Sequence, residues 1–310
     1  MAAIVTITFS PVIDKSTSIP ALVPEKKLKC ADPKMEPGGG GINVARAIKK
    51  LGGEAVAIYP AGGYSGQYFN QLMRNEGITC EVIEAKAETR ENIIVSDEST
   101  HLQYRFGMPG TPLEENEWRQ ILAAIERVAD NGFIVASGSL PPGVPHEIFA
   151  DIAKIADRKN AKLVVDTSGK ALQIAARQGV FLLKPNLSEL SALAGKESIE
   201  LDEIDDAARE IIHKGMCKVV VTSLGSGGAL LVTNDKEKHI MPPRVKTRST
   251  VGAGDSMVAG IVLHLQQGHD IETAVAYGVA CGTAATMNPG TELCKKTDVE
   301  KIYDYIRNGR

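Results

Sequence analysis

The sequence predicts an α/β fold built on one doubly wound, mostly parallel sheet. Short runs rich in β-branched residues alternate with longer amphipathic segments along most of the 310 residues, which is the pattern of strand–helix–strand units. The chain is 43% hydrophobic and 24% charged, ordinary values for a protein that buries a large core. This length suits one large α/β domain or two smaller ones. We expect one domain over residues 1–310.

The expected strands are short apolar runs bounded by turn residues, and the expected helices are longer segments that are apolar on one face. Strands are predicted at residues 4–9, 55–59, 133–137, 162–166, 181–184 and 218–223. Helices are predicted at residues 42–51, 112–130, 146–159, 202–214, 254–267, 271–288 and 298–307.

Two of these helices carry clear end signals. The helix at 42–51 runs into Gly52 and Gly53, as expected where a helix ends. For the helix at 112–130, Thr111 is the expected N-cap, Pro112 suits the first helical position, and Glu114 completes a capping box.

Two segments, at residues 14–36 and 89–108, break the α/β rhythm. The first holds short extended pieces separated by prolines, and the second resembles a hairpin that turns around residues 97–100. Both are too small to fold alone, so we expect them to form one small β-sheet lid. Such a lid leaves an apolar face uncovered, and pairing with a second copy is the usual remedy. A homodimer through the lid is therefore predicted.

Composition and charge exclude several classes of function. The net charge is −3 and no polybasic run occurs, so no nucleic-acid or membrane partner is expected. The N-terminal segment lacks the features of a signal peptide, and no apolar segment is long enough to cross a bilayer. The 5 cysteines are scattered without a C-x-x-C pair, which favours reduced thiols and a cytoplasmic location. The 6 histidines show no metal-binding spacing.

The most informative stretch is S-T-V-G-A-G-D-S at residues 249–256, directly before an apolar helix. Gly252 and Gly254 permit a tight turn that exposes N–H groups at the helix start, where an anion such as a phosphoryl group is stabilised. The carboxylate of Asp255 would repel phosphate, but it is suited to take a proton from a hydroxyl that attacks phosphorus. The alternative is that Asp255 only complements the helix dipole.

A second glycine cluster, P-G-G-G-G-I-N-V-A at 37–45, precedes another helix. It permits close approach of a ligand, and the amide of Asn43 suits sugar hydroxyls. The spacing is not that of a dinucleotide fingerprint, and we expect no strand directly before the cluster because Glu36 and Pro37 intervene. A nicotinamide-dependent oxidoreductase is therefore disfavoured. A plain turn at the helix start is the alternative.

Other candidates lie near expected strand ends or on the lid. Asp14 follows the first strand at the edge where open α/β sheets bind ligands, although a lone Asp is equally a turn residue. Ser139 follows the strand at 133–137 and is a candidate hydroxyl contact. Lys27, Arg90 and Arg105 lie on the lid segments; singly each is a solvated charge, but together they suit a substrate phosphate.

Two further stretches suit a nucleotide. In K-P-N-L-S-E at 184–189, Asn186 and Glu189 share one helix face and make a weak site for a magnesium ion that keeps most of its waters. A capping box is the other interpretation, and both can hold. The S-L-G-S-G-G turn at 223–228 suits nucleotide phosphates or ribose. No Walker P-loop is present.

Taken together, five motifs resemble those of the PfkB family of ribokinase-like carbohydrate kinases, in order and over the whole chain. They are G-G-G-G-I-N-V-A (38–45), G-S-L-P-P-G (138–143), K-P-N-x-x-E (184–189), S-L-G-x-x-G (223–228) and S-T-V-G-A-G-D-S (249–256). The resemblance implies a ribokinase-like doubly wound sheet with a lid, and transfer of a phosphoryl group from ATP, with Mg2+, to a sugar phosphate.

The resemblance also implies roles for individual residues. Asp255 is the general base, and Gly252, Ala253 and Gly254 form the anion hole. The sugar phosphate is bound by Asp14, Lys27, Gly38, Gly39, Gly40, Gly41, Asn43, Arg90, Arg105 and Ser139. ATP is bound by Lys184, Asn186, Ser223, Leu224, Gly225, Ser226, Gly227, Gly228, Thr247 and Thr283, and magnesium by Asn186 and Glu189. A monovalent cation such as K+ matches Ser249, Val251, Ala285, Asn288 and Gly290, although Glu292 stands where a basic residue is expected.

The first glycine cluster bears on the substrate. Family members that use fructose 1-phosphate or tagatose 6-phosphate usually have lysine where this chain has Gly40. Because that cation would meet the acceptor phosphate, glycine here favours phosphorylation of the C1 hydroxyl of fructose 6-phosphate. The other two sugar phosphates remain alternatives within the family. A non-catalytic sugar-phosphate sensor is an alternative of another class, although such a protein has no need of Asp255 and the K-P-N-x-x-E motif.

Overall fold

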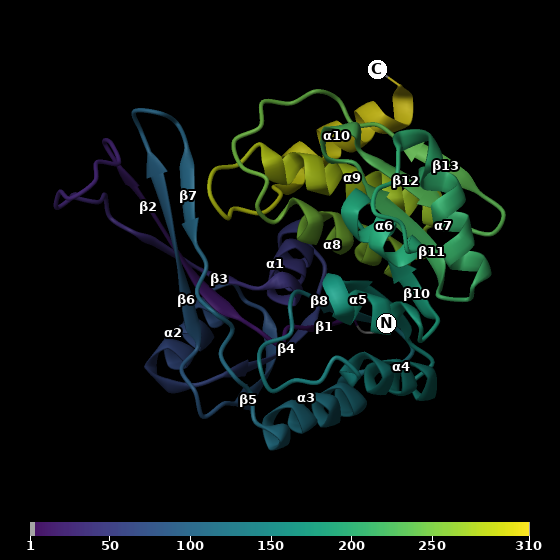
Figure 1. Ribbon diagram of the computed structural model, residues 1–310, viewed down its shortest axis with the longest axis horizontal. Coiled ribbons are helices and arrows are strands. Elements are labelled where there is room, and N and C mark those ends of the chain that lie inside the picture. Colours follow the sequence, from purple (N-terminus) through teal and green to yellow (C-terminus); the bar gives the residue numbers. More distant parts are fainter. Residues whose placement is uncertain (1–3, 310) are drawn as a thin grey trace.

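The computed structural model describes residues 4–309 and contains two sheets, a large one at the centre and a small one that projects from its side (Figure 1). The strands are β1 Ile4–Ile7, β2 Val12–Ile19, β3 Lys34–Gly38, β4 Val56–Ala61, β5 Thr79–Glu84, β6 Arg90–Asp97, β7 Gln103–Phe106, β8 Phe133–Ser137, β9 Lys162–Asp166, β10 Val180–Leu183, β11 Cys217–Ser223, β12 Ala229–Val232 and β13 Glu237–Ile240. The helices are α1 Gly40–Leu51, α2 Gly63–Asn75, α3 Glu115–Val128, α4 Ile148–Arg158, α5 Gly169–Ala176, α6 Leu187–Ala194, α7 Ile204–His213, α8 Ala253–Gln266, α9 Ile271–Thr286 and α10 Lys296–Asn308.

The large sheet has nine strands in the order β13-β12-β11-β10-β9-β8-β1-β4-β5. All neighbouring pairs from β11 to β5 are parallel, and only β12 and β13 are added antiparallel at one edge. Parallel strands need helical crossovers, which is why helices separate most of them along the chain. The predicted mostly parallel sheet is confirmed.

Helices cover both faces of this sheet, and each face has its own core. On one face α1, α8, α9 and α10 pack through residues such as Ile48, Val258 and Val279. On the other face α3, α4, α5, α6 and α7 pack through residues such as Ile125 and Ile152. The predicted doubly wound arrangement is therefore also confirmed.

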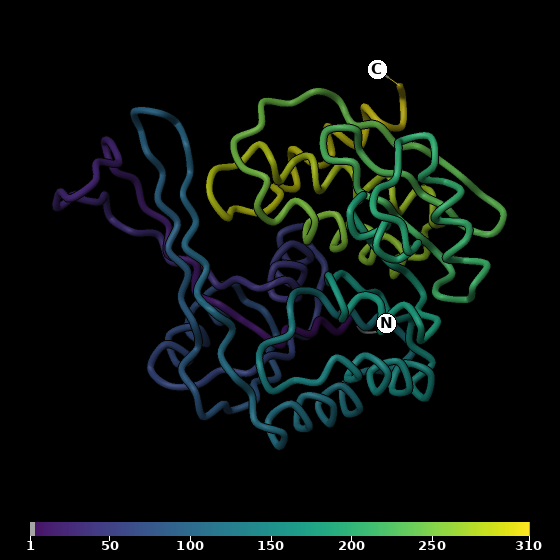
Figure 2. Tube along the Cα trace, in the orientation of Figure 1, coloured from purple at the N-terminus to yellow at the C-terminus, as the bar shows by residue number. Residues whose placement is uncertain are grey.

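The small sheet is built from the two segments predicted to form the lid, and its strand order is β3-β2-β6-β7. Strands β2 and β6 pair in parallel although they lie far apart in the sequence, and Figure 2 shows the two segments running side by side. The hairpin of β6 and β7 is antiparallel, as predicted. The segment between β2 and β3, residues 20–33, extends to the outer end of this sheet (Figure 2).

The predicted start of one helix was wrong. Helix α3 begins at Glu115, with a capping box formed by Glu114 and Glu117 rather than by Thr111 and Glu114. The hydroxyl of Thr111 instead donates to the carbonyl of Glu88 at 2.8 Å, and the N–H of Leu113 donates to the carbonyl of Pro142 at 3.0 Å. These tertiary hydrogen bonds hold the segment outside the helix. The other predicted helices and strands begin and end within two residues of those observed.

The expectation that no strand precedes the first glycine cluster was also wrong. Strand β3 ends at Gly38 and helix α1 begins at Gly40. Because β3 is an edge strand of the lid, paired only with β2 in the described chain, it accommodates Pro37, which a central strand would not. Asp14 was expected in a loop but lies within β2, because the lid sheet starts directly after β1.

None of the helices among residues 4–309 combines the length and the hydropathy required to cross a bilayer. All five cysteines are free in the structure.

Candidate active site

The centre of the site is the start of α8, which points toward the carboxyl ends of the parallel strands. Gly252 is the N-cap residue and has a φ of 72°, a left-handed conformation that favours glycine. Ala253, Gly254 and Asp255 form the first turn, and the N–H of Ser256 closes it on the carbonyl of Gly252 at 2.9 Å. The first N–H groups of α8 are therefore arranged as an anion-binding site.

Asp255 is partly buried and held by two polar side chains from other elements. Asn43 of α1 donates to its Oδ2 at 2.9 Å, and the hydroxyl of Ser137, at the end of β8, lies 3.5 Å from its Oδ1. Burial and the nearby charge of Asp166 raise the pKa of Asp255 to about 7, against the opposing effects of Asn43, Lys184 and Ser137. A carboxylate with this pKa is suited to accept a proton near neutral pH.

A buried ion pair lies beside Asp255. The Nζ of Lys184, whose side chain is 7% exposed, is 3.2 Å from Oδ1 of Asp166 at the end of β9. Burial by itself lowers the pKa of Lys184, but the charge and hydrogen bond of Asp166 outweigh it and raise the pKa above its usual value. A Cβ on Gly254 would lie 3.3 Å from this Nζ, so the lysine reaches the anion-binding turn. A permanent positive charge thus faces the place where a phosphoryl group would lie.

The glycine cluster at 38–41 is packed too closely to allow side chains. A Cβ on Gly38 would overlap the carboxylate of Asp14, and one on Gly40 would overlap Ser137 and lie 2.6 Å from the N of Gly138. A Cβ on Gly41 would overlap the carbonyl of Ile7. The glycines therefore bring α1 against the ends of β1 and β8, which carries Asn43 to Asp255.

A pocket of about 240 Å³ opens between the lid and this centre. Its lining includes four residues predicted for the substrate or the cation, Asp14, Gly39, Arg105 and Val251, and also Asn92 and Thr291. Asn92 of β6 donates to Asp14 at 3.1 Å, and burial raises the pKa of Asp14 despite this hydrogen bond and the charge of Arg90. The pocket offers a carboxylate, an amide and a guanidinium, which suits a sugar that carries a phosphate.

Three further residues predicted to bind the substrate, Arg90, Ser139 and Lys27, do not line this pocket. Arg90 donates through its two terminal nitrogens to the carbonyls of Met108 and Ser10, at 2.9 and 3.3 Å, while its Nε is buried without a hydrogen-bond partner in the described chain. Ser139 is exposed just after Gly138. Lys27 is exposed in the outer segment of the lid, and none of the contacts of the described residues brings it to the pocket. The roles of these three residues stay predictions.

On the nucleotide side, two predicted motifs are adjacent. The N–H of Ser223 donates to the carbonyl of Pro185 at 2.9 Å, and Asn186 and Ser223 form a parallel bridge. The turn at 225–227 is a short 3-10 helix, with positive φ at Gly225 and Gly228. Thr283 lies in α9, where its hydroxyl donates to the carbonyl of Val279 at 2.8 Å, and Thr247 is exposed in the segment before Ser249.

The capping-box interpretation of Asn186 and Glu189 is confirmed. Asn186 caps α6 by accepting from the N–H of Glu189 at 2.9 Å, and Glu189 accepts from the N–H of Asn186 at 2.9 Å. Glu189 also contributes to the raised pKa of Lys184, so the carboxylate lies near the same centre. No group of three or more acidic, His or Cys side chains within residues 4–309 forms a metal cage. One carboxylate and one amide fit a magnesium ion that keeps most of its waters.

The residues predicted for a monovalent cation lie on the loop before α8, in the last turn of α9 (Ala285) and on the loop after α9, and hydrogen bonds join these segments. The hydroxyl of Ser249 donates to the carbonyl of Gly290 at 2.7 Å, and the N–H of Ser249 lies 3.3 Å from the carbonyl of Thr286. The N–H of Asn288 donates to the carbonyl of Ala285 at 3.1 Å. The two loops therefore present backbone and hydroxyl oxygens in one place, which is the ligand type of a hard cation.

Four residues of the site were not predicted from the sequence: Ser137, Asp166, Asn92 and Thr291. Ser137 and Asp166 are the last residues of the neighbouring parallel strands β8 and β9. Their position at the carboxyl edge of the sheet is a usable signal, since ligands bind at that edge. Asn92 and Thr291 carry no such signal, because their roles depend on how the lid packs.

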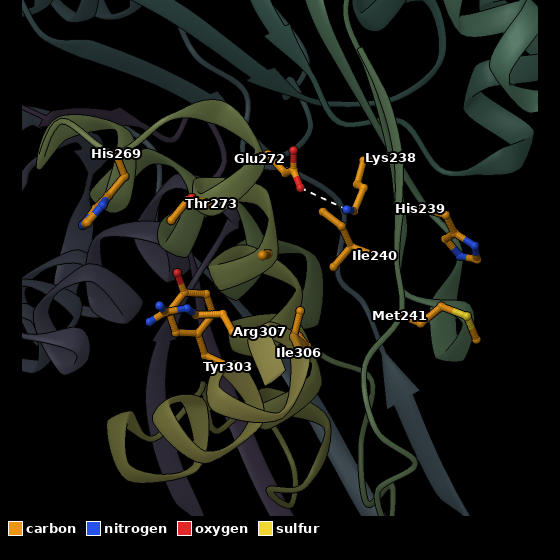
Figure 3. A pocket seen from close by; sticks show the side chains of 11 residues that line it. Lys238, His239, Ile240, Met241, His269, Glu272, Thr273, Tyr303, Ile306 and Arg307 are labelled. Carbon is orange, nitrogen blue, oxygen red and sulfur yellow. Dashed lines mark ion pairs between the residues drawn. The ribbon is translucent and has the colours of Figure 1, made fainter. Parts of the chain in front are cut away.

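A second pocket, of about 550 Å³, lies apart from this centre between β13, α9 and α10 (Figure 3). Lys238 and Glu272 pair across it at 3.1 Å, while His239 points to the other side of β13 (Figure 3). No residue predicted for ATP, sugar or cation lines this pocket. The centre around Asp255 is therefore the candidate active site.

A carboxylate beside an anion-binding helix start, beneath a small sheet lid on a doubly wound sheet, defines a phosphotransferase of the ribokinase-like fold. The family model of the pfkB carbohydrate kinases matches residues 3–298, and the chain belongs to that family.

Known relatives match along nearly the whole chain. The ATP-dependent 6-phosphofructokinase isozyme 2 of Escherichia coli is 46% identical over 307 residues, which cover 99% of both chains. A 1-phosphofructokinase of Borreliella burgdorferi is 30% identical over 305 residues, covering 98% of this chain and 97% of that protein.

Solved structures also match this chain along nearly its whole length. Phosphofructokinase-2 of Escherichia coli in complex with potassium superposes with a TM-score of 0.95 at 45% identity, covering 99% of this chain and 100% of that chain. The same enzyme in complex with fructose-6-phosphate gives 0.92 at 43% identity, with the same coverage. Its tetrameric inhibited form gives 0.94 at 44% identity, also with that coverage, so that relative forms assemblies larger than a dimer.

Proposed function

We propose that this protein transfers the terminal phosphoryl group of ATP to the C1 hydroxyl of fructose 6-phosphate, forming fructose 1,6-bisphosphate in glycolysis. The observation that carries the proposal is Asp255 at the anion-binding start of α8, next to a sugar-sized pocket that contains Asp14 and Arg105. The relative that is 46% identical bears the name of this activity.

In the proposed reaction, Asp255 accepts the proton of the C1 hydroxyl as its oxygen attacks the γ-phosphorus in line with the leaving ADP. The N–H groups at 252–254 and the charge of Lys184 stabilise the negative charge on the group in transfer. Asn43 and Ser137 orient the carboxylate through the contacts described above. The lid excludes water, which limits wasteful hydrolysis of ATP.

Asn186 and Glu189 would hold Mg2+, with Ser223–Gly228 beside the nucleotide; the metal supplies charge neutralisation on the phosphates. The potassium complex of the Escherichia coli relative supports a monovalent cation in this chain. Its ligands in the proposal are Ser249, Val251, Ala285, Asn288 and Gly290. The 46% identity over 307 residues also supports one kinase domain over 1–310. The five scattered, free cysteines favour a cytoplasmic enzyme.

The preference for fructose 6-phosphate rests on Gly40. A Cβ at this position would overlap the hydroxyl of Ser137, so the backbone here is packed for glycine and brings no cation to the acceptor phosphate. The test is a coupled assay of ADP release with Mg-ATP and fructose 6-phosphate, tagatose 6-phosphate or fructose 1-phosphate. Preference for either of the last two would reject the substrate but keep the kinase. Absence of turnover with all three would favour a sensor.

The pH dependence of the reaction follows from Asp255. We expect kcat/KM for fructose 6-phosphate to rise with pH through a one-proton limb near pH 7, because only the carboxylate accepts a proton and burial raises its pKa to about 7. Asp166→Asn removes the neighbouring negative charge that contributes to this shift, so the limb should move to lower pH. The substrate phosphate, with a pKa of about 6, would not respond to that change. An unmoved limb would assign the titration to another group.

Apolar side chains left exposed on the lid support a homodimer. Ile93 and Phe106 are cross-strand partners in β6 and β7 and are 38% and 48% exposed. Covering such a face with a second copy removes apolar surface from water. We expect Ile93→Lys to convert the dimer to a monomer in analytical ultracentrifugation. Val82→Lys, at a 40% exposed position on edge strand β5 of the large sheet, is the matched control and should leave the mass unchanged. A wild-type monomer would reject the assembly.

A further inference from the structure

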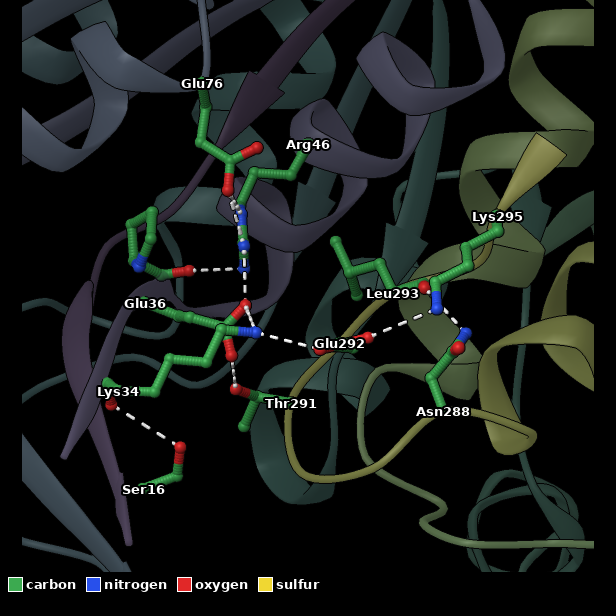
Figure 4. A network of polar contacts seen from close by, with 11 residues as sticks. Ser16, Lys34, Glu36, Arg46, Glu76, Asn288, Thr291, Glu292, Leu293 and Lys295 are labelled. Carbon is green, nitrogen blue, oxygen red and sulfur yellow. Dashed lines mark hydrogen bonds and ion pairs between the residues drawn. The ribbon is translucent and has the colours of Figure 1, made fainter. Parts of the chain in front are cut away.

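The loop between α9 and α10, residues 287–295, contacts both the lid and the start of α8. Figure 4 shows its residues Asn288, Thr291, Glu292 and Leu293 beside a network of charged side chains centred on Glu36. The loop thus lies between the element that covers the sugar pocket and the turn that would bind the transferred phosphoryl group.

At the lid end, the loop is joined to β3 by two polar contacts. The hydroxyl of Thr291 donates to Oε2 of Glu36 at 2.8 Å, and both residues are buried. Lys34 and Glu292 form an ion pair at 2.9 Å, although Lys34 is half exposed. Burial by itself raises the pKa of Glu36, but the hydrogen bond of Thr291 and the charges of Arg46 and Lys34 outweigh it and lower the pKa. Glu36 is therefore a carboxylate, and Thr291 makes a charge-assisted hydrogen bond.

Glu36 is linked to the sugar pocket by strand pairing and by Arg46. It lies directly opposite Asp14 in the pairing of β2 and β3. Arg46 of α1 contacts Oε1 of Glu36 at 3.2 Å and donates to the carbonyl of Pro37, next to the glycine cluster, at 2.8 Å. Any displacement of Glu36 therefore displaces the strand that carries Asp14 and the turn at 38–41.

At the other end, the loop packs on the anion-binding turn. A Cβ on Gly252 would lie 2.6 Å from Cδ2 of Leu293, so this leucine is in contact with the N-cap of α8. Asn288 donates to the carbonyl of Leu293 at 3.1 Å, and Ser249 donates to the carbonyl of Gly290 at 2.7 Å. Leu293 is 1% exposed, which leaves it no room to move independently of the turn.

We propose that Thr291 is a positioning residue whose hydrogen bond to Glu36 couples the two substrate sites, so that sugar phosphate in the lid pocket and nucleotide phosphate at the α8 turn strengthen each other's binding. The inference rests on the proposed kinase function. The physical basis is a series of links: Asp14 pairs with Glu36 between β2 and β3, Thr291 donates to Glu36, the loop backbone joins Thr291 to Leu293, and Leu293 packs on Gly252. Coupling of this kind is reciprocal by thermodynamic necessity.

The test measures binding rather than turnover. Isothermal titration calorimetry of a non-hydrolysable ATP analogue with Mg2+, with and without saturating fructose 6-phosphate, gives the factor by which the sugar tightens nucleotide binding. For the wild type we expect a factor within the range of about 5 to 150 that is typical of coupled sites. Thr291→Val removes the donor at nearly constant volume, and the factor should fall toward one while the analogue alone binds as before. Thr291→Ser keeps the donor and should retain most of the factor.

A second variant interrupts the same link elsewhere. Leu293→Ala removes the contact with Gly252 and should also reduce the coupling factor, with thermal melting used to verify that each variant is folded. An unchanged factor in folded Thr291→Val would overturn the proposal, and so would a wild-type factor of one. Either result would leave the proposed kinase function standing, because that function is tested separately by ADP release with the wild type. Failure of fructose 6-phosphate to bind or react with the wild type would reject the proposed function and the coupling together.

Discussion

The variant Asp255→Asn should fold normally and lose on the order of 10²-fold or more in kcat, the scale expected when a general base is removed. Asparagine has nearly the same shape, and its side-chain oxygen can still accept the hydrogen bond that Asn43 now donates to Asp255. Its amide cannot accept the proton of the attacking hydroxyl. Steady-state kinetics with Mg-ATP and fructose 6-phosphate measure the loss, and calorimetry should show that the sugar phosphate still binds.

The electrostatics of the site predict a second effect of Asp255→Asn, on the melting temperature. Because burial and Asp166 make ionisation of Asp255 unfavourable in the folded protein, removal of the charge should leave the melting temperature at pH 8 equal or higher. Asp157→Asn, an exposed position on α4, is the matched control and should leave kcat unchanged. A kcat of Asp255→Asn within threefold of the wild type would remove this residue from the role of base.

The largest effect on stability is expected from Arg46→Met. The side chain of Arg46 is 2% exposed. Its guanidinium lies 2.6 Å from Glu76 and 3.2 Å from Glu36, and it donates to the carbonyl of Pro37 at 2.8 Å. Methionine fills much of the volume but leaves the carboxylate of Glu36 buried beside Thr291 without its main cation. Breaking a buried pair in this way costs about 3–5 kcal/mol. Urea unfolding should show a lower midpoint with a similar slope.

The matched control for Arg46→Met is Arg119→Met on α3. Arg119 pairs with Glu115 one helical turn away, and both side chains are more than half exposed, at 64% and 66%. Such a pair contributes less than about 1 kcal/mol, so the control should unfold close to the wild type. Similar losses in the two variants would show that the buried network of Figure 4 adds nothing specific to stability. A stable Arg46→Met with weakened sugar binding would restrict Arg46 to a positioning role.

Local signals were sufficient for most elements of the large sheet and for the chemical centre. The period of apolar residues is a property of neighbouring positions, so strands such as β8 and β9 and helices such as α1 were predicted within two residues. The motif at 249–256 is equally local, because two glycines, an acid and the following apolar run suffice to describe an anion-binding helix start. The alternation of strands and helices also implied the doubly wound arrangement.

Local signals indicated the two lid segments and their hairpin, but they could not predict how the lid connects to the rest of the protein. Thr111 fits the sequence pattern of an N-cap, yet its hydroxyl donates to the carbonyl of Glu88. Pro37 fits the pattern of a residue that interrupts a strand, yet it lies in edge strand β3. Arg46 looks like an exposed helical cation, and its burial follows from acceptors on β3 and at Glu76, the residue that caps the end of α2.

The contact between Thr291 and Glu36 joins residues 255 positions apart, and that between Asn43 and Asp255 spans 212. Propensity and periodicity describe the neighbours of a residue along the chain. The distant partner that satisfies a buried polar group is chosen only when the sheets and helices pack together.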